Sequence, residues 1–499
     1  MKKNRIIEER RQLKFFTCPS GIYMYKFKIM ILFLVFSCSF SFGSGIEKTE
    51  MKAGVARAVI TNKSPLVMTN GNISKGTLHD IYARVLVLND GVKRLIIVTY
   101  DLNCLDVATP ILRKRVKDEL GVDPAQLVLL ATHNHSGPIQ INPANFEYGR
   151  WLADRIFNLI NEAIDNEHGP VTLNYGFGNG YFLIGSNAPV DYEIQVLGVM
   201  EKNKTVAILF NQPTHPIQAS DTMVEPGHPG YAMDELEQQY PGALVLYADA
   251  SGGNQFPSNV LDVRNRVSLE KAQALGRQLS DQVKKIMEGP LEDVTGPIQT
   301  KLETISLPLA QPISYEAALA LASKFPKDVG FVDYPNDYRG SNWVRMLLRY
   351  YEKNIPFPQR TDDMVCTDDT YLIHKSDREF LEKYNSSIHD DYPCVYEEVI
   401  VSRIGKLAFV AMQGEVCAPI GMRIKDAFRR DTPIMVFAYM GEHNLYIPTR
   451  EIVRKNSYQA QVIQIQYASP VGWAPEVEDE MVDSVVKMTK SIMEDVEAR

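Results

Sequence analysis

The chain has 499 residues, of which 45% are hydrophobic and 23% are charged, and its formal net charge is −8 at pH 7. These proportions are ordinary for a globular protein, and the length alone suggests two to four domains. The acidic balance argues against nucleic acid or an anionic membrane as a partner.

Residues 1–45 form a segment unlike the rest of the chain. Residues 1–30 carry eight Lys or Arg and two Glu, and the run "IMILFLVFSCSFSFGSG" follows. A basic stretch, a short apolar run and small residues predict an export signal, because the run is too short for a comfortable membrane span. We therefore expect an exported protein that is periplasmic, cell-surface or secreted. Cys38 is a candidate lipid-anchor cysteine that would tie the protein to a membrane surface, although "VFS" is a poor match to the usual preceding residues.

Four cysteines remain after this segment, at positions 104, 366, 394 and 417. They contain no C-x-x-C pair, so a thiolate zinc site is not expected. In an oxidising compartment Cys366 and Cys394 could form a disulfide, while four unpaired buried thiols fit the sequence equally well.

In chain order, the remaining sequence alternates apolar runs with amphipathic segments. The runs rich in β-branched residues predict strands at 81–90, 94–101, 126–132, 205–211, 243–249, 406–413 and 434–440. Helical periodicity predicts helices at 106–121, 145–166, 268–288 and 478–496. We expect one mixed α/β catalytic domain over 46–499, with a β-sheet core surrounded by helices and a polar insertion around 311–395.

Metal-capable side chains follow four of the predicted strands. His133 and His135 follow 126–132, His215 follows 205–211, Glu415 follows 406–413, and Tyr446 follows 434–440 at a short distance. The C-terminal edge of an α/β sheet is where functional groups gather, so these side chains are candidates for one site. Each residue alone would more often be an ordinary loop, capping or packing residue.

Two histidines and one carboxylate form a common zinc shell with an open position for water. In an extended backbone His133 and His135 point the same way, so one can bind a metal while the other faces substrate or water. The sequence therefore predicts one zinc ion per chain at the C-terminal ends of the strands.

Other motifs give weaker signals. Gly252, Gly253 and Asn254 in "YADASGGNQFP" could offer backbone N–H groups to an oxyanion or substrate, or form a plain tight turn. His228 in "EPGHPGY" fits a turn residue. The sequence contains no G-x-S-x-G elbow, P-loop or G-x-G-x-x-G fingerprint.

Taken together, these blocks resemble the neutral/alkaline (non-lysosomal) ceramidases over roughly 52–470. "AGVARAVIT", "LHDIYARVLVLNDG", "ATHNHSGP", "FNQPTHP", "QGE" and "YIPTREIVRKNSYQ" fall in the expected order. The resemblance implies a mixed α/β fold with zinc deep in a pocket. It implies metal ligands at His133, His215, Glu415 and Tyr446, and catalytic roles for His135 and Tyr458.

The sequence departs from that family at two places. Alignment of "GGNQFPSN" on its first Gly and Pro puts Phe256 at the position of a proposed serine nucleophile, and Ser258 lies two residues later. No stretch after the last predicted helix corresponds to the family's C-terminal immunoglobulin-like domain. The resemblance covers the catalytic domain only.

The site residues, together with the resemblance, imply a secreted zinc-dependent hydrolase of C–N amide bonds that uses zinc-activated water, with N-acyl-sphingosine or a related N-acyl lipid as substrate. One alternative is a different N-acyl, ester or lactone substrate, such as a glycan derivative, read by exposed residues such as Tyr338, Arg339 and Trp343. A further alternative is a catalytically silent binding protein of the same fold.

Overall fold

The computed structural model describes residues 50–140, 142–185, 189–258, 267–324, 341–354, 394–429, 431–441, 445–465, 469 and 471–494. The predicted export signal, Cys38 and Cys366 lie outside these residues, so the export signal, the lipid anchor and the disulfide to Cys394 remain predictions. Within the described ranges, no helix has the length and apolarity needed to span a bilayer.

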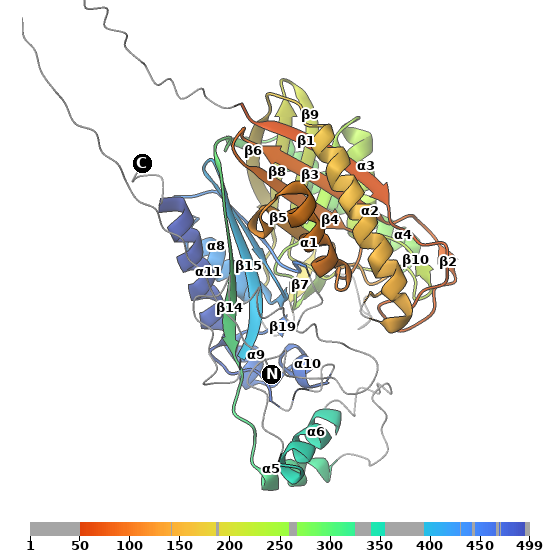
Figure 1. Cartoon of the computed structure of the whole chain (residues 1–499), viewed down its shortest axis with the longest axis vertical. Coiled ribbons are helices and arrows are strands. Elements are labelled where there is room, and N and C mark those ends of the chain that lie inside the picture. Colours follow the sequence, from red (N-terminus) through yellow and green to blue (C-terminus); the bar gives the residue numbers. More distant parts are fainter. Residues whose placement is uncertain are drawn as a thin grey trace, which may run out of the picture. The chain divides into compact units, whose positions relative to one another are not determined.

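The first sheet has four strands in the order β1-β3-β4-β5, with β4 and β5 parallel and the other pairs antiparallel. The strands are β1 (Lys52–Val59), β3 (Tyr82–Asn89), β4 (Arg94–Tyr100) and β5 (Leu127–Ala131). Both faces are buried because successive side chains alternate: Val85 and Val87 enter one core, and Leu86 and Leu88 enter another. Helices α1 (Ala108–Leu120) and α2 (Phe146–Asp165) pack on the first of these faces (Figure 1).

The second sheet has the order β11-β9-β8-β6-β13, and only β11 and β9 are parallel within it. Its strands are β6 (Thr172–Asn179), β8 (Glu193–Glu201), β9 (Lys204–Gln212), β11 (Leu244–Asp249) and β13 (Glu292–Asp293). Helices α3 (Gly227–Gln239) and α4 (Leu269–Met287) pack on each other and cover one face of this sheet.

The third sheet has the order β14-β15-β16-β18, in which β16 and β18 are the parallel pair. Its strands are β14 (Ile298–Pro308), β15 (Cys394–Ile404), β16 (Leu407–Met412) and β18 (Ile434–Phe437). Helix α11 (Val477–Glu494) packs along β14 and β15 and contacts α8 (Ala418–Asp426) (Figure 1).

The three sheets share one hydrophobic core. Leu86 of β3, Leu209 of β9 and Phe409 of β16 are among its fully buried members. Burying a side chain of this size contributes roughly 1.5–3 kcal/mol, so the shared core is a main source of stability for the arrangement. The expectation of a mixed α/β fold is confirmed, although the β-sheet core consists of three sheets.

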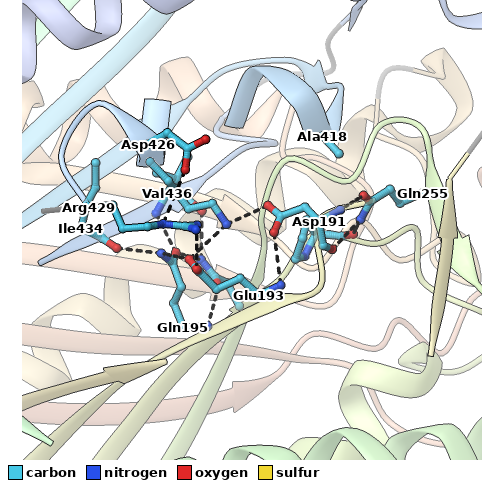
Figure 2. Close-up of polar contacts among 12 residues, drawn as sticks. Asp191, Glu193, Gln195, Gln255, Ala418, Asp426, Arg429, Ile434 and Val436 are labelled. Atoms are coloured by element: carbon cyan, nitrogen blue, oxygen red, sulfur yellow. Dashed lines mark hydrogen bonds and ion pairs between the residues drawn. The ribbon is translucent and has the colours of Figure 1, made fainter. Parts of the chain in front are cut away.

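A buried charge network joins the second and third sheets. The ammonium of Lys425, at the end of α8, lies 2.7 Å from Asp191 Oδ2 and 3.1 Å from Glu193 Oε1. Arg429 Nη2 lies 2.9 Å from the other oxygen of Glu193, and Gln195 donates both to Glu193 and to the carbonyl of Ile434 in β18 (Figure 2). Because buried charges are tolerated only when paired, this network fixes how the two sheets meet.

Shorter elements surround the ends of the parallel strand pairs. Three two-stranded sheets pair β2 with β10, β7 with β12 and β17 with β19. Their bounds are β2 (Gly76–Thr77), β7 (Leu183–Gly185), β10 (Met223–Val224), β12 (Gln255–Pro257), β17 (Glu415–Val416) and β19 (Tyr446–Ile447). Among these, β17 and β19 begin with the candidate ligands Glu415 and Tyr446.

The predicted polar insertion is described in part. Helix α5 (Tyr315–Ala322) contacts α6 (Ser341–Glu352), and α6 in turn contacts α10 (Tyr458–Ile465), which follows α9 (Arg450–Arg454). Tyr338, Arg339 and the side chain of Trp343 lie outside the described residues, so a carbohydrate-binding role for them stays untested.

Candidate metal centre

The loop after β5 carries the two histidines of the H-x-H pair. His133 is buried and has a φ of +55°, a left-handed conformation that non-glycine residues adopt at a cost and that is common at functional sites. His135 is half-buried, and its Nε2 lies 3.0 Å from Nε2 of His133. Both imidazoles therefore present a ring nitrogen to the same point.

His215 lies three residues beyond the last residue of β9, after Pro213 and Thr214, and it has a fixed tautomer. Its Nδ1 lies 2.9 Å from the backbone carbonyl of Gly252, which can only accept a hydrogen bond. The proton therefore sits on Nδ1, and Nε2 presents its lone pair 3.0 Å from the hydroxyl of Tyr446. A histidine held in this way at its distal nitrogen is oriented to bind a metal through the other.

Glu415 and Tyr446 lie beside the same histidines and come from a third part of the chain, strands β17 and β19. They are direct partners in the parallel pairing of β17 with β19, so both side chains leave the same part of this small ladder. Glu415 Oε2 lies 3.3 Å from His133 Nε2 and 3.2 Å from His215 Nε2. This oxygen is buried and accepts no hydrogen bond from the described residues.

These distances fit a zinc ion. With metal–ligand bonds of about 2.0–2.1 Å, the edges of a tetrahedral shell measure about 3.3–3.4 Å. Three separations are close to such edges: 3.3 Å for His133–Glu415, 3.2 Å for His215–Glu415 and 3.0 Å for His215–Tyr446. The ring nitrogens of His133, His135 and His215 also lie within 4.8 Å of one another, so this histidine group could hold a metal ion.

The protonation states also suit a metal ligand set. Burial lowers the pKa of His133, with an opposing effect from Glu415, which favours the neutral imidazole. Burial opposes the charged form of Glu415, but the attraction of His133 and His215 outweighs it and holds the pKa of this carboxyl well below its ordinary value. Burial is the largest cause of the raised pKa of the Tyr446 phenol, and the negative charge of Glu415 raises this pKa further. Neutral imidazole and ionised carboxylate are the forms that bind metals.

Gly252, Gly253 and Asn254 hold the ligand loops together through their hydrogen bonds. A role for them toward an oxyanion or substrate stays a prediction. The N–H of Gly252 donates to Ala250, and that of Gly253 donates to Val416. The side chain of Asn254 accepts from the N–H of Ala418 at the start of α8.

Two of these positions require glycine. A Cβ at Gly252 would lie 2.5 Å from the backbone N of Thr214, and one at Gly253 would lie 2.5 Å from the carbonyl oxygen of Glu415. The turn thus packs directly against the residues that carry His215 and Glu415.

Two tyrosines flank the donor group. Tyr458, the first residue of α10, is 39% exposed, and its ring centroid lies 5.8 Å from that of Tyr446, which leaves it accessible to a substrate. Tyr439 was not predicted: it follows β18 with a φ of +57°, and its ring lies 4.2 Å from that of His133. A single tyrosine after an apolar strand gives no sequence signal that separates it from a core residue.

Phe256 lies beside the donor group. Its ring centroid is 5.2 Å from that of His215, at an interplanar angle of 34°. The sequence alignment put Phe256 where a serine nucleophile would stand, and the structure gives that position an apolar ring. Ser258 follows on the same strand end, where its N–H donates to the carbonyl of Phe182.

His228 differs from the sequence expectation. The prediction of a turn residue is wrong, because His228 lies in the first turn of α3 and is fully buried. Its Nδ1 accepts a hydrogen bond from the N–H of Ile217, and burial lowers its pKa to about 3. It is a neutral core histidine that braces the chain two residues after His215.

Neither a protein-family model nor a curated protein sequence matches this chain. Solved structures do match it. The neutral ceramidase from Pseudomonas aeruginosa superposes with a TM-score of 0.64 at 16% identity over 90% of this chain and 75% of that one. A ceramidase complexed with C2 gives the same TM-score and identity over 90% of this chain and 76% of that one. The chain has a neutral ceramidase-like fold.

Proposed function

We propose that this chain, which has a neutral ceramidase-like fold, is a zinc-dependent hydrolase of C–N amide bonds. The observation that carries the proposal is the convergence of His133, His215, Glu415 and Tyr446 from separate parts of the chain, with donor separations of 3.0–3.3 Å. Among these groups Glu415 Oε2 is buried and accepts no hydrogen bond from the described residues, which is costly unless an ion binds there.

In the proposed reaction, the zinc ion and the side chains of the protein have separate roles. A zinc ion in this position would lower the pKa of a water to about 7 and polarise a carbonyl group. Nε2 of His135 accepts the proton of the attacking water and returns it to the leaving amine. The hydroxyl of Tyr458 donates to the carbonyl oxygen as that oxygen gains negative charge.

No side-chain nucleophile is assigned to this reaction. The ring of Phe256 lies against His215 where a serine would be needed, so we expect water to attack the amide directly. Rapid-quench mass spectrometry under single-turnover conditions checks this: we expect no acyl-protein, whereas a serine mechanism would pass through an acyl ester on the protein. Ser258→Ala is expected to retain activity, and its inactivation would restore a serine mechanism.

The substrate class follows from the fold neighbours. Two of them are ceramidases, and one of these is complexed with C2. We therefore place N-acyl-sphingosines and related N-acyl lipids first, and other N-acyl compounds, esters and lactones second. A catalytically silent binding protein is favoured only by the Phe256 substitution.

Metal analysis paired with a hydrolysis screen tests the proposal. We expect about one zinc per purified chain, loss of amide hydrolysis on chelation and recovery on adding zinc. Glu415→Gln and His215→Ala should each lose zinc, while Glu292→Gln on exposed β13 is a matched control that should keep it. A chain that binds zinc but cleaves no amide or ester would support the silent binding protein instead.

We also propose that the protein is exported, on the basis of residues 1–45 alone. Cell fractionation and the mass of the mature N-terminus test this. A mature chain that begins with acylated Cys38 would establish the lipid anchor, and a full-length chain in the cytosol would refute export.

A further inference from the structure

The two-stranded sheet beside the metal centre has an apolar face. Strands β7 and β12 pair antiparallel, with Phe256 directly opposite Ile184. Directly opposed residues place their side chains on the same face, so Ile184 lies beside Phe256. The flanking pair joins Ser258 to Phe182 by a backbone hydrogen bond, and alternation puts Phe182 on this face too.

This face extends from the metal centre to the surface. Phe256 is half-buried against the His215 ring, whereas Ile184 is 46% exposed. Phe182 is half-buried and packs against the small cluster of Ile217 and Leu275, which anchors that end of the face. A solvent-accessible aliphatic side chain next to a half-buried aromatic one and a polar centre is typical of a ligand site.

We propose that the face formed by Phe182, Ile184 and Phe256, called here the acyl wall, binds the straight apolar chain on the carbonyl side of the substrate. The inference rests on the proposed function and deepens it, because it selects N-acyl lipids over N-acyl sugars. The wall offers carbon atoms along its length, with a hydroxyl only at its edge in Ser258. A sugar ring would need several hydrogen-bond partners there to replace its lost water.

The position of Phe256 means that the acyl wall both binds the acyl chain and positions the carbonyl group of the substrate. An acyl chain that packs on the Phe256 ring lies next to His215 and therefore places its carbonyl carbon at the donor group. Binding energy from the chain then contributes to positioning the reacting bond. A short acetyl group cannot reach Ile184 and gains little from the wall.

A chain-length series tests the wall. With N-acyl p-nitroanilides from acetyl to dodecanoyl, the wild-type kcat/KM should rise by up to roughly fourfold for each methylene that the wall buries. Ile184→Asn and Phe256→Ala should flatten this rise for the longer chains. Val92→Asn, at an exposed position in the turn between β3 and β4, is the matched control and should keep the wild-type slope.

A binding measurement separates the wall from the chemistry. Calorimetric titration of the chelator-treated protein with decanoate should show binding that weakens at least tenfold in Ile184→Asn and is unchanged in Val92→Asn. Circular dichroism checks that each variant is folded. Because this readout needs neither metal nor turnover, it remains informative if amide hydrolysis fails.

The outcomes are distinct. Equal slopes and equal decanoate binding in wild type and Ile184→Asn would overturn the acyl wall and leave the hydrolase proposal standing. Preference of the wild type for N-acetyl sugars over N-dodecanoyl anilide would also overturn it. Decanoate binding that depends on Ile184, without hydrolysis of any substrate, would support the wall and refute the proposed function.

Discussion

His135 could serve either as a metal ligand or as a proton carrier. Its Nε2 is 3.0 Å from that of His133, yet it is the only one of the three clustered histidines that is not fully buried. If it carries protons, His135→Ala should keep about one zinc per chain and lose roughly 10²–10⁴-fold in kcat. Metal content and kcat measured on the same preparation check this, and loss of zinc would make His135 a ligand.

Tyr439 makes a residue-scale prediction about stability. Its hydroxyl is buried with no hydrogen-bond partner among the described residues, while its ring packs on His133. Tyr439→Phe keeps the ring contact and removes an unsatisfied polar group, so the free energy of unfolding should stay the same or rise by about 1 kcal/mol. Tyr439→Leu should lower it. Denaturant unfolding of the chelated proteins measures both, and a destabilised Phe variant would show that the hydroxyl has a partner.

At the residue scale, the sequence predicted well which side chains converge, but it predicted poorly which residues surround them. Four donors could be found because each follows an apolar strand, and strand ends gather at one edge. The roles of Gly252 and Tyr439 could not, because they depend on a carbonyl and a ring meeting histidines far away in sequence. Local sequence carries no record of such contacts.

At the scale of elements, the loop before β3 is clamped to α3 by a histidine. Nε2 of His79 lies 2.8 Å from Asp234 in α3, and Nδ1 contacts the carbonyl of Asp80. The hydrogen bond to Asp234, against the opposing effect of burial, raises the pKa of His79 to about 9 from 6.5. A raised pKa in the folded state stabilises the fold below the unfolded value and loses that effect as pH rises through about 9.

The clamp therefore predicts a pH-dependent difference between two proteins. Asp234→Asn should lower the melting temperature most near pH 6, and the difference from wild type should shrink between about pH 6.5 and 9. Paired thermal melts across this range measure it. A difference that is constant with pH would mean that Asp234 stabilises α3 without His79.

The predicted strands and helices correspond closely to β3, β4, β5, β9, β11, β16, β18 and to α1, α2, α4 and α11. Long apolar or amphipathic runs give strong periodic signals, which explains this agreement. Helix α3 was not predicted because Pro and Gly dominate its first turn. Strand β14 mixes polar and apolar residues, so its period was weak, and its long antiparallel pairing with β15 is non-local.

At the scale of the whole molecule, the charge network at Lys425 makes a prediction about the junction of two sheets. Lys425→Met leaves Asp191 buried without its counter-charge, and breaking a buried pair typically costs about 3–5 kcal/mol. Lys301 in β14, whose side chain is 42% exposed, pairs with Glu303. Lys301→Met should leave the unfolding midpoint almost unchanged because solvent screens that pair. Denaturant unfolding of both variants tests the contrast, which equal midpoints would contradict.

The packing of three sheets around one core could not be predicted. The pattern of each strand indicates that both of its faces are buried, but it does not indicate which sheet packs on which face. The metal donors lie where these sheets meet: β5, β9 and β16 belong to different sheets, and each lies in the parallel pair of its own sheet.

An ion held by His133, His215 and Glu415 would therefore act as a cross-link as well as a reagent. It would close two long loops of chain and tie together three layers that otherwise touch mainly through apolar side chains. Its binding energy would then add to the cohesion of the entire molecule. Loss of the ion would accordingly weaken the protein's resistance to unfolding and proteolysis together with its chemistry.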